Sequence, residues 1–194
     1  MNAKYVWYVS YGSNMCRQRL GCYLEGGQPE GATRTYPGAR DRTPPRADAA
    51  VELPGRVYFG GYSPTWGGGI AFYDHAQPGP SLARAYLITA GQFADIAAQE
   101  MRREPGPDSV VERTLIDGLP AGRFEAGPGR YETLIALGQR DGASMYTFTS
   151  PGGIDDVPHA DPTQPYLAML CQGLQESLQW SQQRALEHFT ALFR

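Results

Sequence analysis

Two polar features of this 194-residue chain carry groups suited to chemistry, a short turn and a single glutamate. The turn is Tyr11-Gly12-Ser13-Asn14, which lies between an apolar run and a helical pattern. A strand-to-helix turn of this kind aims backbone N–H groups and short polar side chains at one point, where an anion or a developing oxyanion is favoured. The alternative is that Ser13 or Asn14 only caps the helix while Gly12 eases the turn.

The glutamate is Glu100, on a predicted amphipathic helix over residues 92–103. The apolar residues of that helix share one stripe: Phe93, Ile96, Ala97 and Met101. Glu100 falls on the same stripe, and an inward carboxylate costs free energy unless it is paired or functional. Glu100 is therefore a candidate general acid and base. The alternative is that it lies at the edge of the apolar stripe, where its side chain reaches solvent or an arginine such as Arg103.

The elements around these residues follow from periodicity and turn signals. Strands are predicted over residues 4–10, 56–62, 70–73, 84–88, 131–137 and 144–149. Helices are predicted over residues 14–20, 92–103, 165–172 and 181–193, with Gly21 as a helix end and Gly173 as a helix end or bend. Thr89 to Gln92 has the form of a capping box, and Asp141-Gly142 predicts a hairpin. Residues 26–55 are rich in Gly and Pro and are expected to form a long loop.

This order of elements predicts one α+β domain over residues 1–194, a small mixed β-barrel or sheet with flanking helices. The hydrophobic content of 41% and the charged content of 19% are typical of a soluble globular protein. With a net charge of −3, no apolar span and no signal-peptide pattern, the sequence gives no reason to expect nucleic-acid or membrane partners, and we expect a cytoplasmic protein. The three cysteines lack a CxxC pair, and the three histidines lack metal-ligand spacing.

Taken together, the turn and the glutamate resemble the gamma-glutamylcyclotransferase-like superfamily. The YGSN turn after the first strand is the most specific part of the resemblance. Further stretches follow in the family's order: Trp66-Gly67-Gly68-Gly69-Ile70-Ala71, Ala98-Gln99-Glu100, Pro162-Thr163-Gln164-Pro165-Tyr166 and Gly173-Leu174-Gln175-Glu176-Ser177-Leu178. The resemblance covers about residues 5–180.

The resemblance implies an enzyme that cleaves a gamma-glutamyl amide without a cofactor or a metal. The substrate's own α-amine attacks its γ-carbonyl and releases 5-oxoproline and a free amine. Glu100 is then the catalytic acid and base. Gly12, Ser13 and Asn14 bind the glutamyl carboxylate or the oxyanion, while Tyr11 and Tyr166 line the pocket and offer hydroxyl groups.

The sequence departs from the family pattern at two places. Met101 follows Glu100 where many relatives carry glycine, and no glycine lies between Glu176 and Leu178. The long loop carries arginines suited to an acidic or bulky substrate, among them Arg34. Two other functions stay open, an amide hydrolase or amidotransferase using the same cavity and a non-catalytic small-molecule-binding module. The amine side of the substrate, an oligomeric state and the use of the loop as a lid are not determined by the sequence.

Overall fold

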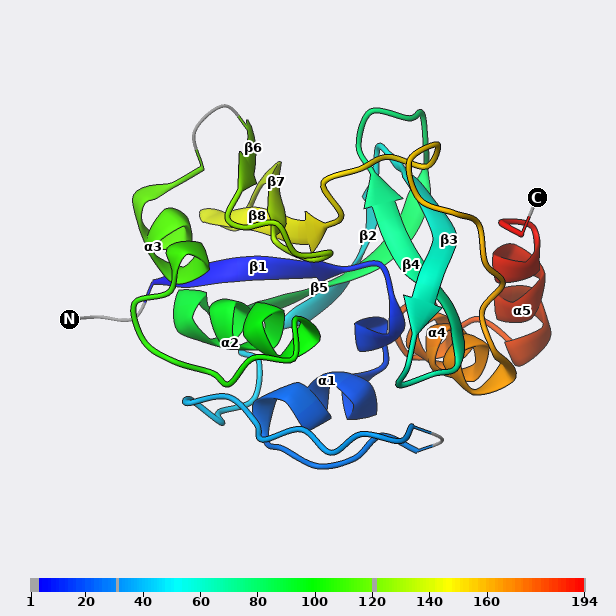
Figure 1. The fold of residues 1–194 in the computed structure, drawn as a ribbon, viewed down its shortest axis with the longest axis horizontal. Coiled ribbons are helices and arrows are strands. Elements are labelled where there is room, and N and C mark those ends of the chain that lie inside the picture. The colour runs from blue at the N-terminus through cyan, green and yellow to red at the C-terminus, as the bar shows by residue number, and fades with distance from the viewer. Residues whose placement is uncertain (1–3, 31, 120–121, 194) are drawn as a thin grey trace.

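The computed structural model describes residues 4–30, 32–119 and 122–193 (Figure 1). A six-stranded mixed sheet has the order β2-β5-β1-β8-β7-β6, and β3 and β4 form a separate pair. The strands are β1 (Tyr5–Ser10), β2 (Asp48–Leu53), β3 (Arg56–Ser63), β4 (Gly68–Asp74), β5 (Ser81–Thr89), β6 (Arg123–Glu125), β7 (Thr133–Arg140) and β8 (Ala143–Thr149). The predicted α+β class with a mixed sheet is confirmed.

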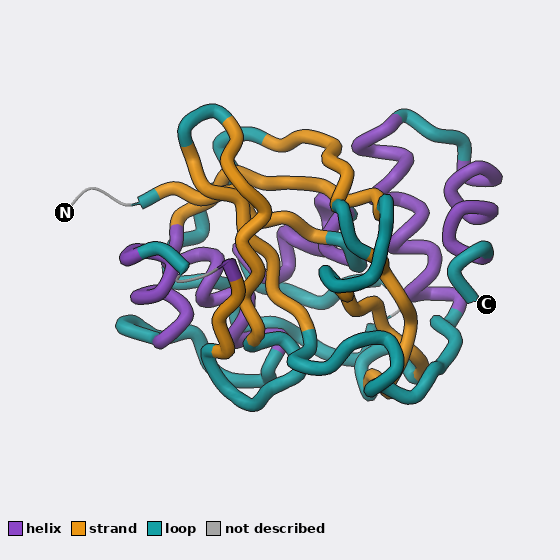
Figure 2. Tube along the Cα trace, turned by 90° about the horizontal axis from the view of Figure 1, so that it is seen from above, coloured by secondary structure: helices purple, strands orange, loops and turns teal. Residues whose placement is uncertain are grey.

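The helices flank this sheet. They are the 3₁₀ turn η1 (Ser13–Met15) and the α-helices α1 (Arg17–Leu24), α2 (Ala90–Glu100), α3 (Val110–Asp117), α4 (Gln164–Leu178) and α5 (Gln182–Thr190). Figure 2 shows the last helices grouped at the end of the molecule where the C-terminus lies. None of the helices in the described ranges has the length and apolar composition needed to cross a membrane.

The first strand lies at the centre of the large sheet. It pairs antiparallel with β5 and parallel with β8, and α2 contacts it. Every residue from Val6 to Ser10 is buried, which explains why the run does not alternate between apolar and polar residues. The Tyr11–Asn14 turn therefore follows a strand that is buried almost throughout.

The helix predicted over residues 14–20 is wrong in its bounds. The chain first makes η1 and then α1, and Gly21 lies inside α1 rather than at its end. Continuing the helix buries Tyr23 and Leu24 almost completely. That burial outweighs the cost of about 1 kcal/mol for a glycine in a helix interior.

Gly173 was expected to end or bend a helix, and the end is wrong. Helix α4 runs through it, because α4 crosses η1 at this point. A Cβ at Gly173 would lie 2.4 Å from the Cβ of Met15 and 2.9 Å from the backbone nitrogen of Cys16. The glycine allows close packing between two elements.

The segment 26–55 is more ordered than predicted. Its last part is β2, which pairs with β5 along six residues. Much of the remainder is fixed to α2, where Arg40 pairs with the buried Asp95 and the N–H of Gly38 donates to the side chain of Gln99. The loop prediction therefore missed a strand whose residues are mostly half-buried or exposed.

Three local predictions concern helix ends and turns. The capping box is confirmed, since Thr89 and Gln92 each accept the other's backbone N–H. The hairpin is confirmed, with Asp141 and Gly142 both at positive φ between β7 and β8. Helix α3, which begins at the Ser109 cap, was not predicted.

Candidate active site

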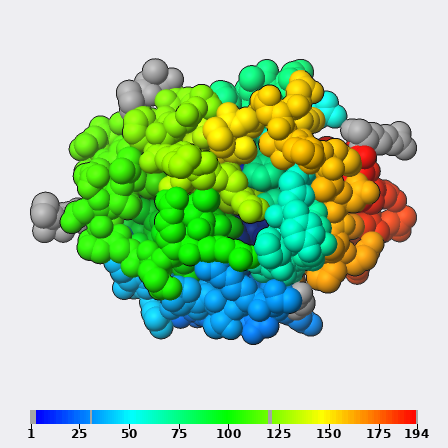
Figure 3. All heavy atoms as spheres, in the orientation of Figure 1, coloured from blue at the N-terminus to red at the C-terminus, as the bar shows by residue number. Residues whose placement is uncertain are grey.

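A pocket opens at the end of β1, with about 860 Å³ of empty space including the part open to solvent. Figure 3 shows this hollow, with the N-terminal segment in dark blue at its floor between the green and teal surfaces. Residues from the whole length of the chain line it, including all five binding residues predicted from sequence: Tyr11, Gly12, Ser13, Asn14 and Tyr166. Glu100 lines it too, so the fold brings the six candidate residues to one cavity.

Asn14 and Glu100 are in direct contact. The Asn14 amide nitrogen donates to a carboxylate oxygen of Glu100 at 3.1 Å and to the Tyr8 hydroxyl at 3.1 Å. Asn14 is buried and Glu100 is half-buried at the last residue of α2. The turn and the helix end are thus joined at the pocket wall by an amide that fixes the orientation of the carboxylate.

Glu100 has no cationic partner within 4.0 Å among the described residues. Arg103, the partner that the sequence left open, pairs instead with Glu132. The carboxylate therefore faces the cavity beside the Asn14 amide donor, without an ion pair to another described residue that would compete with a bound molecule.

The expected cap is not formed. Neither η1 nor α1 has a side-chain hydrogen bond at its N-cap, and the Asn14 side chain turns to Glu100 instead. The start of α1 is held from outside, because Glu176 accepts the backbone N–H of Arg17 at 2.9 Å. The Met15 carbonyl accepts from Arg84 at 3.0 Å and from Tyr86 at 2.7 Å. These bonds hold the turn on the side away from the pocket, so that its other side can line the pocket.

Buried polar atoms without partners lie at the same wall. Among the described residues, Asn14 Oδ1 and the Arg19 atoms Nε and Nη1 are buried and make no hydrogen bond. Such groups are rare, because each costs roughly 1–3 kcal/mol when left unsatisfied. Two further atoms of this kind, Thr133 Oγ1 and Thr147 Oγ1, lie outside the pocket. The three at the pocket wall are suited to a polar ligand.

Arg19 is the main residue that sequence reasoning missed. It is 2% exposed, and its guanidinium lies over the rings of Tyr23 and Tyr36, at 4.2 and 4.4 Å from their centroids. Burial opposes its charge, but Tyr23, Tyr36 and Glu100 raise the pKa of Arg19, so the guanidinium stays cationic. The available signal was the i, i+4 spacing of Arg19 and Tyr23 on one helix face.

The two tyrosines predicted from sequence differ in what they offer. The Tyr11 hydroxyl donates to the backbone carbonyl of Phe148 at 2.9 Å, so its proton is already used. The Tyr166 hydroxyl accepts the Ala71 N–H at 3.1 Å and keeps its own proton to donate. Burial raises the pKa of Tyr166, which keeps the phenol neutral and able to donate at physiological pH.

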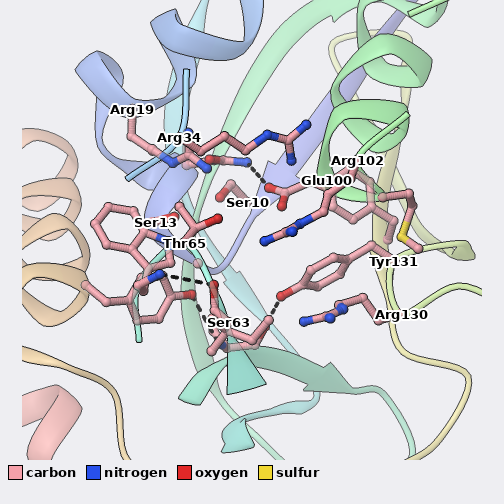
Figure 4. A pocket seen from close by; sticks show the side chains of 18 of the residues that line it. Ser10, Ser13, Arg19, Arg34, Ser63, Thr65, Glu100, Arg102, Arg130 and Tyr131 are labelled. Carbon is pink, nitrogen blue, oxygen red and sulfur yellow. Dashed lines mark hydrogen bonds between the residues drawn. The ribbon is translucent and has the colours of Figure 1, made fainter. Parts of the chain in front are cut away.

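A further phenol, from Tyr131, closes the opposite wall and was not predicted as a site residue. Its hydroxyl donates to the Ala71 carbonyl at 3.0 Å (Figure 4). Tyr131 and Tyr166 thus bind the two polar groups of one residue in β4. This arrangement ties β4 to both sides of the pocket.

Comparison with known proteins gives one similar sequence and a shared fold. No family model matches the chain. "Histone deacetylase 5" of Arabidopsis thaliana is 31% identical over 199 residues, a match that covers 93% of this chain and 29% of that protein. The chain therefore spans less than a third of this relative's length.

Solved structures match at lower identity. The uncharacterized human protein loc79017 is 15% identical with a TM-score of 0.54, over 94% of this chain and 86% of the human one. A structure named gamma-glutamyl cyclotransferase is 15% identical with a TM-score of 0.48, over the same shares. The match to the human protein shows that the fold is shared along nearly the whole chain.

Proposed function

We propose that this protein cleaves a gamma-glutamyl amide to 5-oxoproline and a free amine. The observation that carries the proposal is the unpaired Glu100 carboxylate, held by the Asn14 amide at 3.1 Å inside a pocket with orphaned polar atoms. The YGSN turn and its ordered companion segments, which resemble the gamma-glutamylcyclotransferase-like superfamily, support the same reaction.

The reaction needs a positioned acid and base more than it needs a nucleophile from the protein. The substrate's α-amine forms the new N–C bond with the γ-carbonyl, and the old amide C–N bond then breaks. Glu100 accepts the proton lost by the amine and returns it to the departing nitrogen. Because the nucleophile is part of the substrate, folding the glutamyl chain toward its own carbonyl supplies much of the rate enhancement.

Charge develops at two places, and the pocket has groups for each. The tetrahedral oxygen is suited to the N–H groups of Gly12 and Ser13 and to the free hydroxyl proton of Tyr166. The glutamyl α-carboxylate is suited to the cationic Arg19, whose Nε and Nη1 have no partner. Asn14 Oδ1 is an acceptor for the α-amine.

The test is product analysis with gamma-glutamyl-alanine and the full chain. We expect 5-oxoproline and alanine, and we expect Glu100→Gln to lower kcat by about 10²–10⁴-fold. Glu104→Gln is the matched control, because Glu104 is exposed four residues further along, and it should keep full turnover. Full activity of Glu100→Gln would remove Glu100 from the mechanism.

Amide hydrolysis is the second candidate, because a sequence relative matched over 29% of its length is named a histone deacetylase. An oriented carboxylate can also activate water. Release of glutamate from gamma-glutamyl-alanine, or of acetate from an acetyl-lysine peptide, would favour hydrolysis over cyclisation. Tight binding of these compounds without turnover would favour a non-catalytic binding module.

A further inference from the structure

We infer that the amine half of the substrate carries two or more carboxylates, an inference that rests on the proposed function. Three arginines from separate segments line the pocket besides the buried Arg19: Arg34, Arg102 and Arg130. The whole chain has a net charge of −3, so this concentration of cations is a local property of the pocket. Glu100 is the one carboxylate among the lining residues.

All four pocket arginines lack an acidic partner within the described ranges, whereas six arginines elsewhere form ion pairs: Arg17, Arg40, Arg84, Arg103, Arg123 and Arg140. The other described arginines outside the pocket form no such pair: Arg42, Arg46, Arg56, Arg113 and Arg184. Pairing with a carboxylate is thus common outside the pocket, but not general. Unpaired guanidinium groups gathered around one cavity repel one another unless an anion is bound between them. The pocket is therefore complementary to negative charge.

Arg102 occupies a backbone position that favours glycine. Its φ is +59°, directly after α2, where the Arg102 N–H bonds to Gln99 and the Arg103 N–H bonds to Ala98. This is the pattern of a helix C-terminus in which the left-handed residue is usually glycine. An arginine there costs about 1 kcal/mol of strain. A strained arginine two residues after Glu100 is explained if its positive charge binds the ligand.

Arg130 lies with Arg34 and Arg102 at the rim of the pocket, which is the part that these three arginines line. The carboxylate of Glu132 holds the loop that carries Arg130. Glu132 accepts the backbone N–H of Gly129 at 2.8 Å and pairs with Arg103 at the end of α2. The loop before β7 is thereby tied to the segment that carries Arg102. Figure 4 shows Arg102 and Arg130 across the cavity from Ser13.

Arg34 comes from the long loop and is partly fixed in place. One of its terminal nitrogens donates to the Gln99 carbonyl at 3.1 Å, and its guanidinium lies 4.8 Å from the centroid of the Tyr36 ring. Arg130 is held in a similar way by one bond to the Tyr62 carbonyl at 3.1 Å. Each guanidinium has five N–H donors, so both retain donors for an anion.

The number of cations sets the charge of the ligand. The glutamyl head supplies one carboxylate, which the proposed function assigns to Arg19. A single further carboxylate cannot satisfy three guanidinium groups that arise from three segments. An amine half with two carboxylates, such as a glutamate or aspartate residue joined through its α-nitrogen, matches the rim.

The experiment compares two substrates that differ in one group, gamma-glutamyl-glutamate and gamma-glutamyl-glutamine. They have nearly the same shape, but the second lacks one carboxylate. We expect kcat/KM for 5-oxoproline release to be about 10–100-fold higher with gamma-glutamyl-glutamate, and the ratio to fall as ionic strength rises. Equal kcat/KM values with clear turnover would overturn this inference and leave the proposed function standing. Absence of 5-oxoproline from both substrates would overturn the two together.

Variants assign the preference to the rim. Arg102→Gly and Arg130→Gln should each reduce the ratio several-fold, because they raise KM for gamma-glutamyl-glutamate more than KM for gamma-glutamyl-glutamine. Gln179→Gly is the matched control for relief of a left-handed residue, because Gln179 has a φ of +55° at the end of α4, outside the pocket. A ratio unchanged by both arginine variants would contradict the assignment.

Discussion

The side-chain amide of Asn14 donates to the carboxylate of Glu100 at 3.1 Å, although 86 positions separate the two residues in the sequence. The contact joins the turn after β1 to the last residue of α2. It leaves the oxygen of the Asn14 amide, Oδ1, buried and without a partner among the described residues. One amide thus positions the proposed base and retains an acceptor for the ligand.

Replacing Asn14 should lower activity without removing the base itself. Asn14→Ala leaves Glu100 and Tyr8 without their shared donor, and we expect kcat/KM to fall about 10–100-fold. Asn14→Asp puts a second carboxylate beside Glu100, and repulsion should raise the apparent pKa of the pair. The pH–rate profile of this variant should therefore shift to higher pH. An unshifted profile with unchanged kcat would contradict the positioning role.

The sequence allowed prediction of the residues that meet in the pocket, but not of how they are used. The YGSN turn and Glu100 were identified from type and position, and the structure brings them together. Arg19 was not, since the burial of an arginine over two tyrosine rings depends on the fold of the loop that carries Tyr36. Helical periodicity reports which face is buried, not which polar group is tolerated there.

Element boundaries were missed for a related reason. Gly21 and Gly173 both suggested helix ends by local propensity, yet both lie inside helices. At Gly21 the gain comes from burying the next turn of α1, and at Gly173 from contact with η1. Strand β2 was missed because most of its residues remain half-buried or exposed and show no clear hydrophobic pattern. The strand is defined by its backbone pairing with β5.

The pairing of Arg40 with Asp95 should hold the long loop against α2. Asp95 is 1% exposed on its side chain, while Arg40 is 33% exposed, so we expect Asp95→Ala to reduce the free energy of unfolding by about 1–3 kcal/mol. The freed loop should be cut faster by trypsin after the exposed Arg42 or Arg46. Urea unfolding and a digestion time course measure the two effects. Glu104→Ala, at an exposed site, should change neither, and equal cleavage rates in both variants would contradict the anchor.

The two helix glycines should respond to alanine in opposite directions. Gly173→Ala places a methyl group 2.4 Å from the Cβ of Met15, and we expect a loss of about 1–3 kcal/mol in the free energy of unfolding. At Gly21 a Cβ has no heavy atom within 4 Å among those described, so Gly21→Ala should stabilise the protein by about 0.5–1 kcal/mol. Thermal unfolding of the pair provides the measurement. Stabilisation by Gly173→Ala would show that α4 is not constrained by η1.

His188 should make the fold less stable in mild acid. It packs edge-on against Trp180 and Phe189 in the last turn of α5, and burial lowers the pKa of His188 from its ordinary value of 6.5. As the pH falls through about 6.5, the unfolded chain binds a proton that the folded chain does not, so the free energy of unfolding decreases until the pH passes the folded-state pKa.

This loss should be smaller in His188→Gln, measured by urea unfolding at a series of pH values from about 7.5 to 5. His75→Gln is the matched control, since His75 is exposed, and it should retain the wild-type slope. Charges elsewhere in the protein contribute equally to all three curves, so the difference between the variants isolates His188. Parallel curves for His188→Gln and the wild type would mean that the packing against Trp180 accommodates the charged imidazole.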